Sequence, residues 1–134
     1  MKAFHLERKM MSFLGDFYPT GNLFIMFPTE AHARRAEALL VKDGHDSSTM
    51  SLLTPDDVLG IVHLFDNRDF WLPSVGTEER TARHFGDLAR AGHYALLVPV
   101  RDVRHCEKVM AALKDAGVSC AVRYRHLVIE DLVE

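Results

Sequence analysis

Two short apolar stretches decide the fold: Phe24-Ile25-Met26-Phe27-Pro28 and Ala95-Leu96-Leu97-Val98-Pro99. Each run is too short for a stable helix and is followed by a proline, so each predicts a strand covered on both faces. A helix is expected after each run, and both helices end in the pattern Leu-x-x-x-Gly, at residues 40–44 and 113–117. The chain therefore contains an internal repeat of strand, helix and strand.

Capping residues and apolar periodicity set the expected boundaries of the other elements. Thr29, Thr77 and Asp102 are helix starts, and Thr54-Pro55-Asp56-Asp57 is a strong one, with a capping hydroxyl and a proline at the first helical position. We expect helices over residues 29–43, 54–65, 77–92 and 102–116, and strands over residues 23–27, 49–53, 94–98 and 119–129, the last with a break near 125–126.

This order predicts an α+β fold that is ferredoxin-like: two β-α-β units with a helical insertion between the halves and a short N-terminal helix. The length of 134 residues fits one domain over residues 1–134. Within it we expect an N-terminal helical segment (1–19), the first β-α-β unit (22–53), the helical insertion (54–92) and the second β-α-β unit (93–132).

The two apolar strands are expected at the centre of the sheet, and their second face needs cover. A bare apolar face of that size is rare on a monomer. The inserted helices, the N-terminal segment or a second subunit can supply the cover. A homodimer that pairs through the sheet is therefore one hypothesis.

Composition excludes some classes of function. The formal net charge is −3 and the pI about 6.2, which argues against a general nucleic-acid binder. Cys106 and Cys120 fall on apolar faces and are expected to be buried, inert thiols. We find no secretory leader and no apolar run long enough to span a bilayer, so we expect a cytoplasmic protein.

Eight histidines are present, but none has a metal-binding spacing, and no nucleotide-binding or nucleophile motif occurs. We expect no metal and no cofactor. His32 and His105 fall early in the two equivalent helices and are expected to be counterparts. His45 and His126 are expected on the surface, and His93, at a strand entry, is expected to hydrogen-bond the backbone.

One candidate ligand site emerges from charged and aromatic residues. Arg80 and His84 lie four residues apart on one face of the helix expected over residues 77–92. If that helix lies near the last strand, they could share an anion with Arg123 and Tyr124. The alternative is an ordinary solvated helix face.

The sequence also resembles a bacterial family similar to the general stress protein 17M type. The stretches that carry the resemblance are residues 91–98, the Ala116-Gly117 helix end, and Tyr124 with residues 128–132. It covers residues 22–132 and implies the ferredoxin-like fold, a bacterial source and a link to stress, with no established enzyme activity. Residues 125–127 are Arg-His-Leu where the family has Gly-Arg-Trp, so no shared function of that strand is implied.

Three functions stay open at this point. The first is a non-enzymatic protein that acts through self-association or a protein partner. The second is a sensor or carrier of a small molecule, with a pocket between the sheet and the inserted helices near Phe70, Trp71 and Phe85. The third is an enzyme of the dimeric α+β barrel type. The interaction function predicts a filled core, whereas the carrier predicts a cavity and the enzyme predicts sheets that pair face to face.

Overall fold

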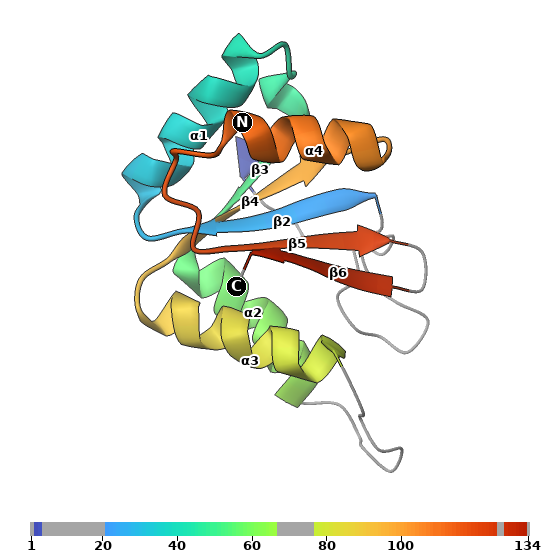
Figure 1. The fold of residues 1–134 in the computed structure, drawn as a ribbon. Helices are drawn as coiled ribbons and strands as arrows, with labels where there is room; N and C mark the ends of the chain where they lie inside the picture. The colour runs from blue at the N-terminus through green and yellow to red at the C-terminus, as the bar shows by residue number, and fades with distance from the viewer. Residues whose placement is uncertain (1, 4–20, 67–76, 126–127, 134) are drawn as a thin grey trace.

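The computed structural model describes residues 2–3, 21–66, 77–125 and 128–133, with side chains for residues 21–62 and 83–122. The described elements form an α+β domain of three layers, in which one sheet lies between two pairs of helices (Figure 1). The strands are β1 (Lys2–Ala3), β2 (Asn22–Phe27), β3 (Ser51–Leu53), β4 (Tyr94–Pro99), β5 (Cys120–Arg125) and β6 (Val128–Val133). The helices are α1 (Glu30–Lys42), the short 3-10 turn η2 (Ser47–Thr49), α2 (Pro55–Asp66), α3 (Thr77–Arg90) and α4 (Val103–Ala112).

The two apolar runs are central neighbours, as predicted. The strand order is β1-β3-β4-β2-β5-β6, and β2 and β4 pair antiparallel with Phe24 opposite Leu97 and Ile25 opposite Leu96. Residues 23–27 and 95–98 are all at most 3 % exposed. Such continuous burial requires a layer on each side of the sheet.

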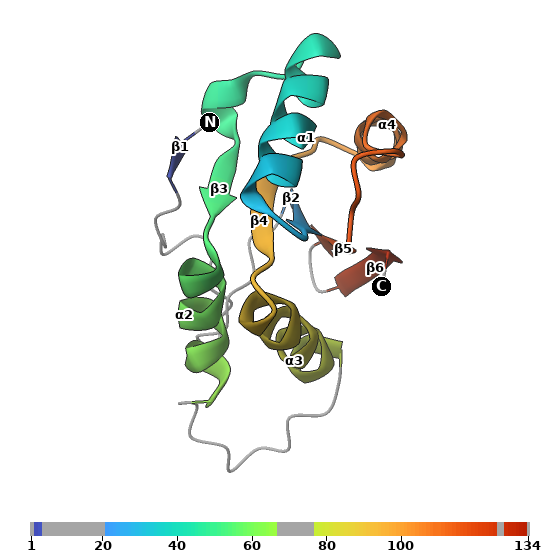
Figure 2. The same cartoon turned by 90° about the vertical axis from the view of Figure 1, so that its left-hand side faces the viewer.

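The first face is covered by the helices of the repeat. Figure 2 shows α1 and α4 together on one side of the sheet. Their small and branched side chains interlock with alternate residues of the central strands. This core contains Leu23, Ile25 and Phe27 from β2, Leu96 and Val98 from β4, Ala33, Ala36 and Leu40 from α1, and Cys106 and Val109 from α4.

The second face is covered by the inserted helices α2 and α3 (Figures 1 and 2). Val58, Ile61 and Val62 of α2 and Phe85 and Ala89 of α3 pack against Phe24, Met26, Ala95, Leu97, Cys120 and Val122 of the sheet. The rings of Phe24 and Phe85 stack with centroids 4.3 Å apart. The inserted helices α2 and α3 therefore cover the second face of β2 and β4. The exposed apolar face that motivated the hypothesis of a sheet-mediated homodimer is absent over these two strands.

The capping residues identified in the sequence begin the helices. Thr54 and Asp57 form a reciprocal pair at the start of α2: Thr54 Oγ1 accepts from the Asp57 backbone N–H at 3.1 Å, and Asp57 Oδ2 accepts from the Thr54 N–H at 3.0 Å. Thr29 and Asp102 cap α1 and α4 without a return bond: each side chain accepts the backbone N–H of the third residue after it, His32 and His105. These bonds satisfy donors that have no partner within the helix.

Replacing Thr54 by Ala should lower the free energy of unfolding by about 1 kcal/mol, the usual value of an N-cap hydroxyl. Thr54→Ser keeps the hydroxyl and should stay near the wild-type value. Urea unfolding of the three chains measures the difference. Equal stability of the Ala and Ser variants would contradict the capping role.

Four sequence predictions need correction. Helix α4 ends at Ala112 rather than 116, and a turn follows it. The predicted last strand, 119–129, is two antiparallel strands, β5 and β6, so the expected break is a reversal of the chain. Lys2–Ala3 form a strand parallel to β3, not part of a helix, while the rest of the N-terminal segment, residues 4–20, lies outside the described residues. The alternation of residues 49–53 predicts a half-buried strand with Ser51 on its polar face, yet Ser51 is only 4 % exposed because the α2–α3 layer covers that side.

Other predictions concern burial and membranes. Cys106 and Cys120 are buried, 4 % and 1 % exposed, as expected for packing groups. Within the described part of the chain, no helix is both long and apolar enough to cross a bilayer.

Candidate functional site: a histidine pair between two helix ends

A pocket of about 510 Å³ opens where the end of α1 meets the start of α4. Strands β2 and β4 are antiparallel, so the helices that follow them also run in opposite directions. This brings the loop after α1 beside the first turn of α4. The pocket is lined by Asp43, Gly44, His45, Asp46, Thr49, Pro99, Val100, Arg101, His105 and Lys108.

Two imidazoles from the two halves of the repeat meet in this pocket. Nε2 of His45 lies 2.8 Å from Nε2 of His105, and the rings meet edge to edge, with centroids 4.9 Å apart and planes 13° apart. His45 directly follows Gly44, whose φ of 99° turns the chain out of α1. Both histidines are half-buried, so His45 lies at the surface as predicted but is partly covered by its partner ring.

The hydrogen bonds around the pair fix where each proton sits. The backbone N–H of Arg101 donates to Nδ1 of His105 at 3.0 Å, so a neutral His105 carries its proton on Nε2. That proton is donated to Nε2 of His45. His45 then carries its own proton on Nδ1 and donates it to the carbonyl oxygen of Leu40 at 3.2 Å. All four ring nitrogens are satisfied when both rings are neutral.

Charged groups surround the pair. Arg101 and Lys108 bring two cations, and in the part of the chain that the structure describes their side chains form no hydrogen bond or ion pair. Asp46 is engaged elsewhere, because its Oδ1 accepts from the backbone N–H and the hydroxyl of Ser48 at 2.9 and 2.8 Å. Those bonds lower the pKa of Asp46. The pocket thus presents two cations and the carboxylate of Asp43 beside the two imidazoles.

The surroundings of His105 disfavour its charged form. Partial burial is the main cause that lowers the pKa of His105, and the positive charge of Arg101 and the neighbouring His45 add to it, while Asp102 opposes it. The pKa of Asp102 is itself lowered, chiefly because its carboxylate accepts from the His105 backbone N–H at 2.8 Å. The lowered pKa of His105 agrees with the neutral pair that the hydrogen bonds require.

We expect the free energy of unfolding to fall as the pH is lowered from about 7.5 to about 5.5. His105 and His93 both have folded pKa values below the ordinary 6.5, so the unfolded chain binds their protons more readily. Their stabilisation is full above the unfolded pKa and is lost as the pH falls toward the folded pKa. Urea unfolding at several pH values measures the slope, which His105→Gln should reduce. A stability that rises on acidification would be inconsistent with this assignment.

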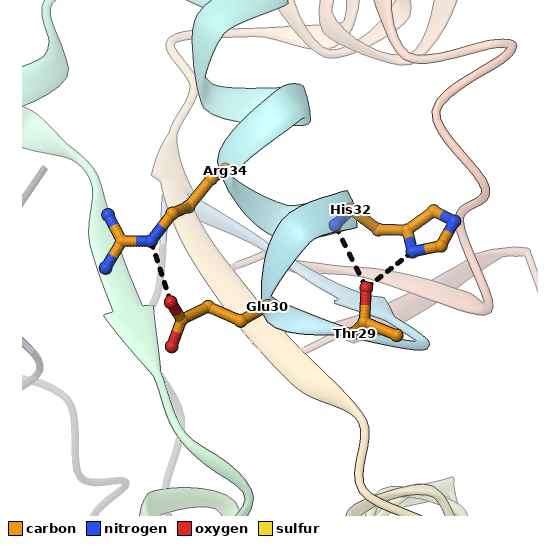
Figure 3. Close-up of polar contacts among 4 residues, drawn as sticks. All are labelled: Thr29, Glu30, His32 and Arg34. Atoms are coloured by element: carbon orange, nitrogen blue, oxygen red, sulfur yellow. Dashed lines mark hydrogen bonds and ion pairs between the residues drawn. The ribbon is translucent and has the colours of Figure 1, made fainter.

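His32 is the counterpart of His105, as the repeat predicted. Each is the third residue after its N-cap, and Figure 3 shows Thr29 accepting from the His32 backbone N–H at 3.2 Å and contacting His32 Nδ1 at 2.7 Å. Beside them, Arg34 pairs with Glu30 at 3.0 Å on an exposed helix face. His32 has no imidazole partner within the described residues, because its ring lies against Gly117 in the segment between α4 and β5. The pair is thus formed at only one of the two equivalent positions.

The anion site predicted from the sequence is placed only in part. Arg80 and His84 are on α3, and Arg123 and Tyr124 are on β5, opposite Leu23 and Asn22 of β2. Helix α3 packs on the sheet face that carries Cys120 and Val122, so the helix and the strand meet in one core. The side chains of Arg80, Arg123 and Tyr124 lie outside the described residues. His84 is described, and its Nε2 is buried without a hydrogen-bond partner among them.

His93 bonds a side chain in addition to the backbone. Its Nδ1 lies 2.8 Å from Oγ of Ser119, at the entry to β5, while its backbone N–H donates to the carbonyl of Leu88. Partial burial is the main cause that lowers the pKa of His93, with His84 contributing. Among the described residues the imidazole bond is thus to a hydroxyl, whereas the sequence predicted a bond from the imidazole to the backbone.

The histidine pair does not suit a metal ion. A neutral imidazole that binds a metal through Nε2 carries its proton on Nδ1 and needs an acceptor there. Nδ1 of His105 faces a donor, the N–H of Arg101. Among the described residues, moreover, no group of three or more His, Cys, Asp and Glu side chains is placed to hold a metal ion.

None of the family models, curated proteins or solved structures with which the chain was compared matches it. The site must therefore be interpreted from its own geometry. The sequence missed the pair because His45 and His105 are 60 positions apart and meet only when the two helices pack side by side. The one available signal was the repeat, which places the end of the first helix beside the start of the second.

Proposed function

We propose that this chain is a non-enzymatic, cytoplasmic bacterial domain of ferredoxin-like fold that acts by binding a ligand or a protein partner at the pocket between α1 and α4. The strand order supports the fold. For the four strands of the repeat, β2, β3, β4 and β5, the order across the sheet is 2-3-1-4, which read from the other edge is 4-1-3-2. Parallel strands joined by a helix in each half complete the pattern.

The observation that carries the proposal is the contrast between a filled core and an open pocket. Both faces of β2 and β4 are covered by this chain's own helices, and Phe85, near which the sequence predicted a pocket, is 2 % exposed and stacked on Phe24. Residues 70 and 71 lie outside the described part. The polar and cationic side chains gather instead at the rim of the pocket beside His45 and His105. Binding of a ligand or partner at the surface fits this arrangement better than catalysis in a buried cavity.

The dimeric α+β barrel enzyme is less favoured. That assembly pairs two sheets face to face, and here α2 and α3 occupy the face that would be buried. Self-association remains a prediction. It would have to use a sheet edge or the outer surfaces of the helices rather than the centre of the sheet. The link to stress rests on the family resemblance alone.

A thermal-shift screen tests the proposal. The full chain should be stabilised by at least one compound or short peptide from a library of metabolites and acidic peptides. The shift should disappear in the Arg101→Ala/Lys108→Ala double variant and persist in Lys114→Ala, an exposed lysine beyond the far end of α4. Mass spectrometry should recover the ligand unchanged. The binding site is wrong if no compound stabilises the chain, or if a stabilising compound has the same effect on the double variant. The non-enzymatic function is wrong if the compound is recovered chemically changed.

A further inference from the structure

The directions of the hydrogen bonds in the histidine pair leave one ring nitrogen that can accept a further proton. In the closed pair, Nε2 of His45 is an acceptor, while its Nδ1–H is held by the carbonyl of Leu40. Nδ1 of His105 is held by the N–H of Arg101 and cannot take a proton without placing two donors against each other. A proton can therefore add only at Nε2 of His45, and the bond between the two rings must then open.

Opening the pair produces two convergent donors. His45 then presents Nε2–H while keeping its bond to Leu40, and His105 presents Nε2–H while still accepting from Arg101. An oxygen that accepts from both nitrogens at about 2.8 Å each requires the rings to move apart, from contact to roughly 5 Å between nitrogens. The pocket beside them provides the space.

The charges around the pair are mixed, and two cations among them are placed to meet an anion. Lys108 from α4 and Arg101 from the loop before it carry side chains with no ion pair among the described residues. Opposing charges come from Asp43 and Asp46 on the loop after α1 and from Asp102, and the last two carboxylates are engaged by backbone N–H groups. A protonated His45 would raise the local charge by one unit as the anion arrives.

We propose that the pocket binds an oxyanion, such as a sulfate, phosphate or carboxylate group, between the imidazoles of His45 and His105, with uptake of one proton from solvent at Nε2 of His45. This inference deepens the proposed function and rests on it, because it names the chemistry of the ligand at the same site. Because a proton is taken up, the affinity for the oxyanion should increase as the pH is lowered. The anion and the proton each favour the open pair, so each raises the affinity of the site for the other.

Calorimetric titration of the full chain with sulfate tests the inference. Sulfate keeps its charge across neutral pH, so any pH dependence belongs to the protein. At constant ionic strength set with sodium chloride, affinity should increase as the pH is lowered from about 8 to about 6. Titrations in two buffers of different ionisation enthalpy should show uptake of one proton per sulfate. Equal affinity across this range, or no binding at its acid end, overturns the proposal.

Two variants and a control separate the roles. His45→Gln retains a donor but cannot take up a proton, so sulfate should bind more weakly and without proton uptake. His105→Gln should weaken binding as well, whereas Lys114→Ala should match the wild type. Thermal melts confirm that each variant is folded, and amide chemical shifts of Arg101 and His105 report binding independently of heat. Proton uptake that survives in His45→Gln contradicts the assignment of the proton to that ring.

The oxyanion can be a free ion or part of an organic molecule. Methyl sulfate carries the same chemistry on a carbon group, and its affinity relative to inorganic sulfate distinguishes the two sources. Failure of this inference is also distinguishable from failure of the proposed function. If sulfate does not bind but the library yields a ligand lost in the Arg101→Ala/Lys108→Ala variant, the binding function stands and the oxyanion is wrong.

Discussion

Phe85→Ala should lower the free energy of unfolding by about 3–5 kcal/mol, a large fraction of the stability of a domain of this size. Phe85 is 2 % exposed and its ring stacks on Phe24 of the central strand, with centroids 4.3 Å apart. Truncation removes the apolar contact and leaves a cavity between α3 and the sheet. Urea unfolding, followed by circular dichroism, measures the loss.

The control for this prediction lies on the same helix. Asp87 and Arg90 form an exposed pair at 3.2 Å, and pairs of this kind contribute little. Asp87→Ala should therefore change the stability by less than about 0.5 kcal/mol. If Phe85→Ala is as mild as Asp87→Ala, α3 does not cover the sheet and the filled core is wrong.

Gly117→Ala should cost about 2 kcal/mol, more than the same change at Gly44. Both glycines have positive φ, 80° and 99°, in which an alanine is strained by roughly 1 kcal/mol. A Cβ at Gly44 would meet nothing within 4 Å, whereas a Cβ at Gly117 would lie 2.9 Å from Cδ2 of His32. The ring would have to move and give up its contact with Thr29. Urea unfolding of both variants compares the two costs.

A double-mutant cycle isolates the steric part of this cost. His32→Ala removes the ring that the new Cβ would touch, so Gly117→Ala should become nearly as mild in that background as Gly44→Ala. The coupling free energy of the cycle measures the steric interaction between His32 of α1 and a side chain at residue 117. Additive effects, with no coupling, would contradict the close approach of His32 and Gly117.

Local signals predicted most of the fold. The apolar runs ended by Pro28 and Pro99 identified the central strands, and the caps at Thr29, Thr54 and Asp102 placed three helix starts. These features act within a few residues of the chain, so they are visible in the sequence. The repeat then predicted the relation of His32 to His105.

The features that the sequence did not predict depend on contacts between distant segments. The reversal between β5 and β6 is set by their pairing, and β-structure propensity alone does not distinguish one long strand from two. The burial of Ser51 depends on the layer formed by α2 and α3. The pair of His45 and His105 depends on two loops that meet only after the helices pack.

The most direct test of the central claim is the tautomer of each histidine, measured by long-range proton–nitrogen NMR correlation of the imidazoles at about pH 8, well above the ordinary histidine pKa. We predict opposite tautomers: His45 with its proton on Nδ1 and His105 with its proton on Nε2. The same tautomer on both rings, or the exchange average typical of free imidazoles, would contradict the closed pair and the binding mechanism built on it.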